Sequence, residues 1–315
     1  ADDIVFVPNA TTGLNIVARS LGLKAGDEIL TTDHEYGALD RTWRFLSAKN
    51  GASYIRQPLP YPLTSPAEVV ETLWARVTPR TRVLFISHLT SPTALILPVR
   101  ELIRRAREHG ILSVVDGAHV PGQLSLDLGE LDPDFYSGNC HKWMCSPKGS
   151  AFLYSRRDKQ PLIEPLIVSW GWEAIMPGPS RFVDEQEWQG TRDVAAYLAV
   201  PGAIQFLNAH HWESVRAECH LLAQQARQSI ESITGMTALS PDSPAWYAQM
   251  VSVPLPPCDA EQLKSRLYDE YHIEVPIVVW NDRTLIRISI QAYNTRADID
   301  ALVNALKRLL PEVGN

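Results

Sequence analysis

Residues 111–119, Ile-Leu-Ser-Val-Val-Asp-Gly-Ala-His, decide the fold class of this chain. Residues 112–115 are nearly continuous in apolar side chains, which is typical of a strand that a parallel sheet covers on both faces. A strongly charged amphipathic helix is predicted directly before it, over residues 99–109. The strand ends at Asp116, and in an open α/β sheet ligands bind beyond the carboxyl ends of the strands. The stretch therefore predicts a βαβ unit with an acid at its ligand-binding edge.

The same alternation extends over the first two-thirds of the chain. Apolar runs predict strands at residues 4–7, 28–31, 83–87, 111–115 and 151–154, and amphipathic runs predict helices at 12–21, 68–76 and 99–109. This order is typical of a mostly parallel central sheet flanked by helices. Residues 161–179, rich in Pro, Gly and Trp, predict an irregular loop. A long helix is expected over 193–210, kinked or broken at Pro201.

The last third of the chain predicts a smaller α+β domain. Helices are expected at residues 213–234, 260–270 and 296–310, and strands at 249–254 and 285–291. A chain of 315 residues usually folds into more than one packed unit. We expect a large domain over residues 1–205 and a small C-terminal domain over 206–315.

Composition excludes several classes of partner. The net charge of −7 leaves no basic surplus to attract nucleic acid or an anionic membrane. No apolar run approaches the roughly 20 residues that span a bilayer. The chain has four cysteines without disulfide-framework spacing, which favours a reduced cytoplasm. It enters an apolar strand at Ile4 without an initiator Met, so we expect that further residues precede this segment in the natural protein.

The candidate catalytic and binding residues lie in three polar segments, each of which follows a predicted strand. Asp116, beside Gly117 that would let a ligand approach, suits contact with a cationic ring, although it could equally cap the next turn. Lys142 has Cys140 and Trp143 as neighbours, and an amine in apolar company loses its proton more readily, as imine formation requires. A surface lysine whose stem covers the tryptophan is the commoner alternative. Residues 9–13, Asn-Ala-Thr-Thr-Gly, open a helix after a strand and predict an anion site, or an ordinary N-cap.

The order of these segments resembles that of the class V aminotransferase group of fold-type I pyridoxal-phosphate (PLP) enzymes. Residues 9–13 resemble the phosphate loop, 116–119 the acid at the ring nitrogen with its neighbour, and 141–142 the lysine that holds the cofactor. Residues 187–193, Glu-Trp-Gln-Gly-Thr-Arg-Asp, resemble the loop that reaches the partner's phosphate across a dimer. Residues 287–289 with 292–294 resemble the segment whose arginine binds the substrate carboxylate. The resemblance covers nearly the whole chain and implies the fold-type I architecture.

The resemblance also implies a role for each residue near the cofactor ring. Lys142 would hold PLP as a Schiff base and later move protons at Cα of the substrate. Asp116 would keep the pyridine nitrogen protonated, which makes the ring an electron sink. His119 would hydrogen-bond the ring oxygen. Tyr36 would stack on the ring, with His34 as the alternative.

The phosphate and the substrate are assigned in the same way. Arg287 would pair bidentately with the carboxylate of an amino-acid substrate, which a planar guanidinium does better than an ammonium. The protein would be a homodimer, with one phosphate ligand coming from the partner subunit. The expected phosphate ligands are Thr11, Thr12, Asn139 and His141 from one subunit and Thr191 from the other.

The cofactor alone does not name the reaction, because it can activate every bond at Cα. Residues 188–201 and 141–149 are most similar to the isopenicillin N epimerase branch, which implies epimerisation or racemisation of an amino acid. That branch also covers C–S lyases, so a lyase, a cysteine desulfurase-like activity or an aminotransferase is the alternative. Desulfurases carry a nucleophilic cysteine shortly before the segment that matches Arg287, and residues 272–282 contain none. An epimerase also needs a proton donor on the opposite face, which Tyr36, His34 or a water could provide.

Two alternatives to a PLP-dependent enzyme are considered. Scattered His and Asp side chains could serve a metal-dependent hydrolase, but their spacings match no standard metal motif, and we expect no metal. A non-catalytic relative that serves as a binding or scaffold protein is the other.

Overall fold

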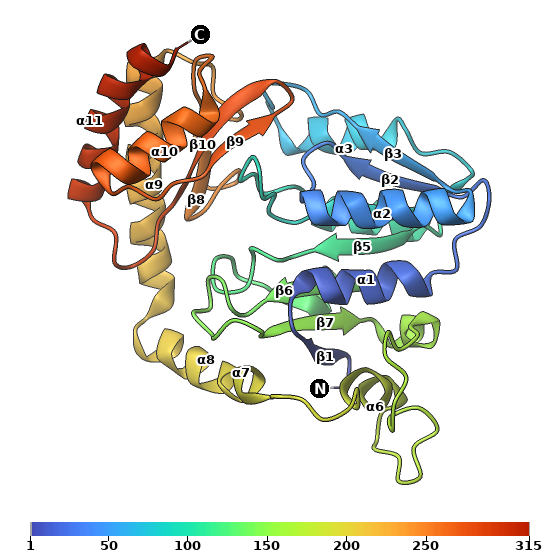
Figure 1. Ribbon diagram of the computed structural model, residues 1–315. Coiled ribbons are helices and arrows are strands. Elements are labelled where there is room, and N and C mark those ends of the chain that lie inside the picture. Colours follow the sequence, from blue (N-terminus) through green and yellow to red (C-terminus); the bar gives the residue numbers. More distant parts are fainter. Residues whose placement is uncertain (1, 315) are drawn as a thin grey trace. The chain divides into compact units, whose positions relative to one another are not determined.

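The computed structural model describes residues 2–314, which divide into two compact units, each with its own sheet (Figure 1). Unit 1 comprises residues 2–59, 67–89 and 97–209. Unit 2 comprises residues 60–66, 90–96 and 210–314. Among the described residues, no helix is both long enough and apolar enough to cross a membrane.

Unit 1 is built on a seven-stranded sheet with the order β1-β7-β6-β5-β4-β2-β3. Strand β7 is antiparallel to both of its neighbours, and the other pairings are parallel. The predicted mostly parallel sheet is therefore confirmed. The strands are β1 (Ile4–Val7), β2 (Glu28–Thr32), β3 (Ser53–Gln57), β4 (Thr81–Ser87), β5 (Leu112–Asp116), β6 (Phe135–Asn139) and β7 (Ala151–Ser155).

The helices of unit 1 flank this sheet, as the sequence predicts. Helices α1 and α2 lie side by side in front of it in Figure 1. Their apolar faces, with Leu14, Val17 and Trp43, share one buried cluster with Phe85 and Val114 of the sheet. The helices are α1 (Ala10–Ser20), α2 (Gly37–Asn50), α3 (Pro66–Trp74), α4 (Val99–Glu108), α5 (Leu128–Leu131), the 3₁₀ helix η1 (Arg157–Leu162), α6 (Arg181–Glu187), α7 (Ala195–Leu198) and α8 (Val200–Ala209).

Unit 2 is a smaller α+β unit. Its sheet is antiparallel with the order β8-β10-β9, from β8 (Met250–Pro254), β9 (Ile277–Trp280) and β10 (Arg283–Ser289). Three helices accompany it: α9 (Trp212–Thr234), α10 (Ala260–Tyr271) and α11 (Arg296–Val313). Helix α11 begins with a reciprocal capping box between Thr295 and Asp298, which satisfies the first free N–H groups of the helix.

The structure differs from the sequence prediction in several places. Strands β6 and β9 and helices α5, η1 and α6 were not predicted. Helix α2 and the edge strand β3 were not predicted: the apolar residues of α2 are sparse, and β3 is half exposed. The helix expected over 193–210 is two helices that break at Ala199. Pro201 explains the break, because it lacks an N–H and its ring would clash with a carbonyl one turn earlier, whereas in the first turn of α8 it is tolerated. Helix α11 continues past Pro311 because Val313 is buried.

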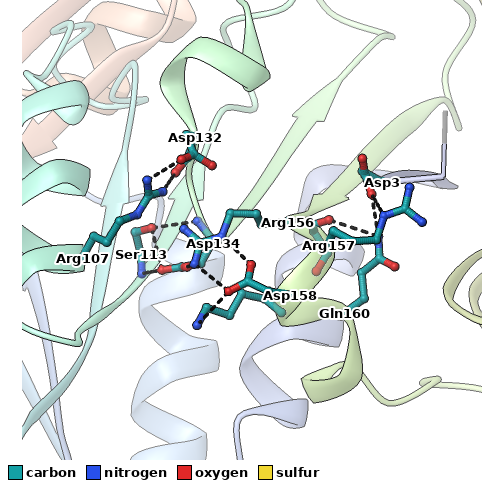
Figure 2. Close-up of polar contacts among 11 residues, drawn as sticks. Asp3, Arg107, Ser113, Asp132, Asp134, Arg156, Arg157, Asp158 and Gln160 are labelled. Carbon is teal, nitrogen blue, oxygen red and sulfur yellow. Dashed lines mark hydrogen bonds and ion pairs between the residues drawn. The ribbon is translucent and has the colours of Figure 1, made fainter.

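The amino edge of the unit 1 sheet is closed by a cluster of ion pairs (Figure 2). The Asp134 carboxylate, 4% exposed, accepts hydrogen bonds from the Ser113 N–H (2.8 Å) and hydroxyl (3.0 Å). Arg156 follows β7 and lies 2.9 Å from the second oxygen of Asp134. Arg156 also pairs with the exposed Asp158. Both oxygens of the Asp134 carboxylate therefore have partners. These contacts join strands β5, β6 and β7 at the edge where β5 and β6 begin and β7 ends.

Candidate active site

Several of the predicted site residues of unit 1 lie at the carboxyl edge of the sheet. Strands β4 and β5 end in register there, with Ser87 beside Asp116, and Asp116 lies beside Ser137 of β6. Parallel strands aligned in this way bring their last side chains together, although these are far apart in the sequence. The edge is therefore where chemistry can be concentrated.

Asp116 is a buried acid with little compensation. The residue is 4% exposed, and its carboxylate accepts a hydrogen bond from the Ala118 N–H at 2.9 Å. Burial raises the pKa of Asp116, and the Ala118 hydrogen bond and Lys142, when it is protonated, lower it only in part. A further cation near this carboxylate would stabilise its ionised form. Asp116 can thus hold a protonated ring nitrogen.

Lys142, His119 and Trp143 form a chain of contacts next to this acid. The Lys142 Nζ lies 3.0 Å from His119 Nε2, and the Trp143 indole Nε1 donates to His119 Nδ1 at 3.3 Å. His119 and Trp143 are each 8% exposed, whereas Lys142 is exposed. The expectation that apolar neighbours would desolvate this amine is therefore wrong. Its tryptophan neighbour turns inward to the histidine, and the amine is held by the imidazole.

Gly117 has a different purpose from the one expected. A Cβ at this position would lie 2.0 Å from the ring of Tyr136, so the space is filled by protein. The Tyr136 hydroxyl lies 3.1 Å from Nδ1 of His88, which is itself buried. Glycine is needed here so that Tyr136 can pack beneath Asp116, and the idea that it opens an approach for a ligand is wrong.

Glu35 is a site residue that sequence reasoning missed. Its carboxylate is buried and accepts hydrogen bonds from the Ser87 N–H (2.9 Å), the Ser87 hydroxyl (2.6 Å) and the Thr32 hydroxyl (2.7 Å). Burial raises the pKa of Glu35 to about 7, and the negative charge of Asp116 adds to the rise. The only signal in the sequence was its place between the expected ring contacts His34 and Tyr36.

Those two neighbours of Glu35 differ in access to solvent. Tyr36 is 46% exposed and is the N-cap residue of α2. His34 is 2% exposed, and its Nε2 lies 3.5 Å from the Asp33 carboxylate. Burial lowers the pKa of His34 to about 4, against the opposing effect of Asp33, so the ring is neutral near pH 7.

The segment predicted to bind phosphate lies at the first turn of α1. Asn9 caps the helix and accepts from the Thr12 N–H (2.8 Å) and hydroxyl (3.1 Å). Asn139, at the end of β6, accepts from the Ala10 N–H at 2.8 Å. Among residues 2–314, no side chain accepts a hydrogen bond from the Thr11 N–H. Gly13 lets the helix approach the sheet, since a Cβ would lie 2.5 Å from the Ser137 hydroxyl.

The three other predicted site residues lie in separate surroundings. His141 is half-buried, and its Nδ1–H donates to the Ser150 carbonyl at 2.9 Å. Thr191 is exposed between α6 and α7. Arg287 belongs to β10 of unit 2, where its Nη1 donates to the Ser91 carbonyl (2.7 Å) and hydroxyl (3.1 Å). Burial lowers the pKa of Arg287.

The described residues give no support to a metal-dependent hydrolase. Within the part of the chain that the structure describes, no three His, Cys, Asp or Glu side chains are grouped so that they could hold a metal ion. Of the side chains weighed for that hypothesis, His88, His119 and Asp134 contact Tyr136, Lys142 and Arg156, in that order. The other two, Asp116 and His141, bond to the backbone of Ala118 and Ser150.

Comparison with known proteins identifies the family. The family model described as Aminotransferase class-V matches residues 1–302. Isopenicillin N epimerase of Amycolatopsis lactamdurans is 38% identical over 319 residues, which cover 97% of this chain and 80% of that protein. L-cysteine desulfhydrase of Arabidopsis thaliana is 28% identical over 348 residues, 99% of this chain and 75% of that protein. The solved complex between the cystine C-S lyase C-DES and its product cysteine persulfide superposes with a TM-score of 0.84 at 24% identity, over 100% of this chain and 82% of that one.

The structural likeness at that identity confirms the fold-type I architecture. The family model that matches residues 1–302 and the relative at 38% identity show the family as well as the fold. This chain belongs to the class V aminotransferase family.

Proposed function

We propose that this protein is an epimerase or racemase that exchanges the proton at Cα of an amino acid, with PLP attached to Lys142. The observation that carries the proposal is the arrangement of an amine, an imidazole and a buried acid at one edge of the sheet. When bound, PLP withdraws electrons from Cα and makes its C–H bond acidic. The protein residues must then hold the cofactor, orient the substrate and move the proton.

The residues fit a pyridinium phosphate in their donor chemistry. Asp116 is a buried carboxylate with too few partners, which a protonated ring nitrogen would supply. Thr11 offers its N–H at the start of an eleven-residue helix, whose dipole favours an anion. It is a stronger phosphate ligand than Thr12, whose N–H and hydroxyl already donate to Asn9.

The more distant phosphate ligands have different tasks. Asn139 would shape the loop, because its amide oxygen holds the Ala10 N–H. His141 carries a hydrogen on Nδ1, so its Nε2 could donate to a phosphate only when the ring is protonated. A phosphate dianion favours that form.

Substrate binding is assigned to Arg287 of unit 2. Its Nη1 has only neutral acceptors, and among residues 2–314 its buried Nε has no hydrogen-bond partner. A buried guanidinium with a free N–H favours a carboxylate as its partner, and every α-amino acid provides one.

Two groups would deliver protons to opposite faces of Cα. Lys142 would serve one face as base and acid. Tyr36 is favoured for the other face and for contact with the ring, because its side chain is exposed at the site while His34 is buried beside Asp33. A water could take the place of the Tyr36 hydroxyl.

We also propose that the protein works as a homodimer, with Thr191 reaching the partner's phosphate. Large apolar side chains are exposed on the loop before α6, among them Trp170 (76%), Ile175 (87%) and Met176 (91%), and Trp188 (63%) precedes Thr191. Exposed apolar surface of this extent is typical of a protein–protein contact.

A C–S lyase acting on a cysteine derivative is the second candidate, because L-cysteine desulfhydrase is among the relatives. A lyase needs one base and a leaving group at Cβ. A desulfurase that forms a persulfide is disfavoured: Cys145 is the only exposed cysteine among the described residues, and burial raises the pKa of its thiol.

Incubation of the PLP-loaded protein with a panel of amino acids in deuterated water separates the candidates. We expect deuterium to appear at Cα, which NMR detects, together with racemisation, which chiral chromatography detects. Release of pyruvate with sulfide or a thiol, without racemisation, would establish the lyase instead. Lys142→Ala should lose either activity, and Lys148→Ala, a nearby exposed lysine, should keep it.

A further inference from the structure

Trp143 bonds to His119 in a way that restricts where the imidazole carries its hydrogen. The indole N–H is only a donor, so His119 Nδ1, 3.3 Å away, must be the acceptor and must carry no hydrogen. An imidazolium and the Nδ1–H tautomer both place a hydrogen on that nitrogen, facing the indole hydrogen. Trp143 therefore selects the neutral ring with its hydrogen on Nε2.

The selected hydrogen faces the amine of Lys142. His119 Nε2 lies 3.0 Å from Lys142 Nζ, so the imidazole N–H is the donor and the nitrogen lone pair of the amine is the acceptor. An ammonium has no lone pair and cannot accept. The contact therefore favours the unprotonated amine, which is the form that attacks a carbonyl carbon.

The positions of both partners are fixed by the backbone around them. Gly122 has a φ of +83°, and a Cβ there would lie 2.4 Å from the carbonyl carbon of Trp143, so only glycine allows the two segments to pack this closely. Gln123 donates from its side chain to the His119 carbonyl at 2.9 Å. The turn that carries His119 and the segment that carries Trp143 are thus held against each other.

We infer that Trp143 is a positioning residue that acts through His119: it keeps the imidazole neutral and directs the Nε2–H toward Lys142 and the group bound there. This inference rests on the proposed role of Lys142. Packing alone would require an aromatic ring at residue 143, but it would not require an indole N–H. The two roles can therefore be separated by removing the hydrogen and keeping the ring.

The test is a ring-nitrogen NMR titration of the PLP-loaded protein labelled with ¹⁵N-histidine, with His119→Gln used to assign the signal. In the unmodified protein, Nδ1 of residue 119 should lack a hydrogen and Nε2 should carry one. Trp143→Phe, and a benzothienylalanine at position 143 that replaces only the indole N–H by sulfur, should raise the pH midpoint of ring protonation by about one unit, the worth of one hydrogen bond. The acid limb of the kcat/KM profile should move with it. Trp74→Phe, at a half-buried tryptophan at the end of α3, should change neither.

Three outcomes would overturn the inference: a hydrogen on Nδ1 in the unmodified protein, an unchanged midpoint in the benzothienylalanine variant, or an equal shift in Trp74→Phe. Borohydride reduction of the same samples shows separately whether the cofactor is attached to Lys142. Attachment with an unmoved midpoint rejects only the role of Trp143. Absence of attachment, with the midpoint shifted, rejects the proposed function and leaves the hydrogen-bond assignment standing.

Discussion

The two edges of the unit 1 sheet each bury an aspartate but treat it differently. At the amino edge, Asp134 receives two hydrogen bonds from Ser113 and an ion pair from Arg156 (Figure 2). At the carboxyl edge, burial raises the pKa of Asp116 and of its neighbour Glu35, and Lys142, when it is protonated, offsets the rise at Asp116 only in part. The carboxylate of Asp134 is neutralised by partners within the chain, whereas that of Asp116 has few partners and could pair with a cationic ligand.

This difference separates stability from function along the same strands. A buried carboxylate with a full set of partners holds the strands in register, and removal of one partner leaves a buried charge. A buried carboxylate with few partners destabilises the fold unless a cation arrives, and such perturbed acids are frequent at functional sites. We therefore expect substitutions at the carboxyl edge to change activity and those at the amino edge to change stability.

The largest effect is expected for Lys142→Ala. Loss of the amine should lower kcat/KM on the order of 10³-fold, because the variant lacks both the attachment point and the proton-transfer group. Thermal unfolding should change little, since the side chain is exposed. Steady-state kinetics and a thermal melt check both parts, and a variant that unfolds without losing activity would reverse the proposed division between the edges.

The second effect is a loss of stability at the other edge. Asp134→Ala should lower the free energy of unfolding by about 3 kcal/mol, because it leaves Arg156 and the Ser113 donors without their buried acceptor. Urea unfolding followed by circular dichroism measures it. The kcat/KM of the folded fraction should stay within twofold of the wild-type value, on the order expected for a site remote from the chemistry. A large loss of kcat/KM in this variant would show that the edges are coupled.

Glu35→Gln should sharpen the comparison through its dependence on pH. The folded pKa of Glu35, about 7, lies above its ordinary value of 4.5, so its contribution is fully present below pH 4.5 and is lost as pH rises through about 7. The glutamine does not titrate. Above pH 7 it should be more stable than wild type by about 2 kcal/mol, after allowance for one weakened hydrogen bond.

Urea unfolding at a series of pH values checks this result. The stability difference between Glu35→Gln and wild type should grow between about pH 4.5 and 7 and then level off. A difference that is constant across this range would mean that Glu35 does not titrate there.

The smallest effect is expected at the rim of the amino edge. Asp158 pairs with Arg156 at 2.6 Å, but its side chain is 58% exposed. Asp158→Ala should lower the free energy of unfolding by less than about 1 kcal/mol, because solvent screens an exposed pair. If urea unfolding shows the same loss of stability for Asp158→Ala as for Asp134→Ala, burial does not determine how much each ion pair stabilises the fold.

The sequence predicts the architecture well because its patterns are local. The apolar run at residues 112–115 and the charged helix before it both lie within two residues of their predicted bounds. Asp116 could be identified because it ends a strand, and the carboxyl end of a parallel strand lies at the ligand-binding edge whatever the order of the strands. Strand β3 was missed because an edge strand needs no continuous apolar run.

The interactions that tune the site could not be read in the same way. Glu35 meets Ser87 across 52 positions, and Trp143 meets His119 across 24. Gly117 was recognised as special, but the reason lies in Tyr136 on the neighbouring strand. Such contacts depend on strand order and register, which a single sequence does not encode in any local pattern.

The claim on which this account depends is that the amine of Lys142 attaches the cofactor. Sodium borohydride reduction of the PLP-loaded protein, followed by proteolysis and mass spectrometry, tests it directly. We predict that the cofactor is found on the peptide containing Lys142 and that none is fixed in Lys142→Ala. Cofactor fixed to Lys148 or to another lysine, or fixed to the same extent in Lys142→Ala, would contradict it.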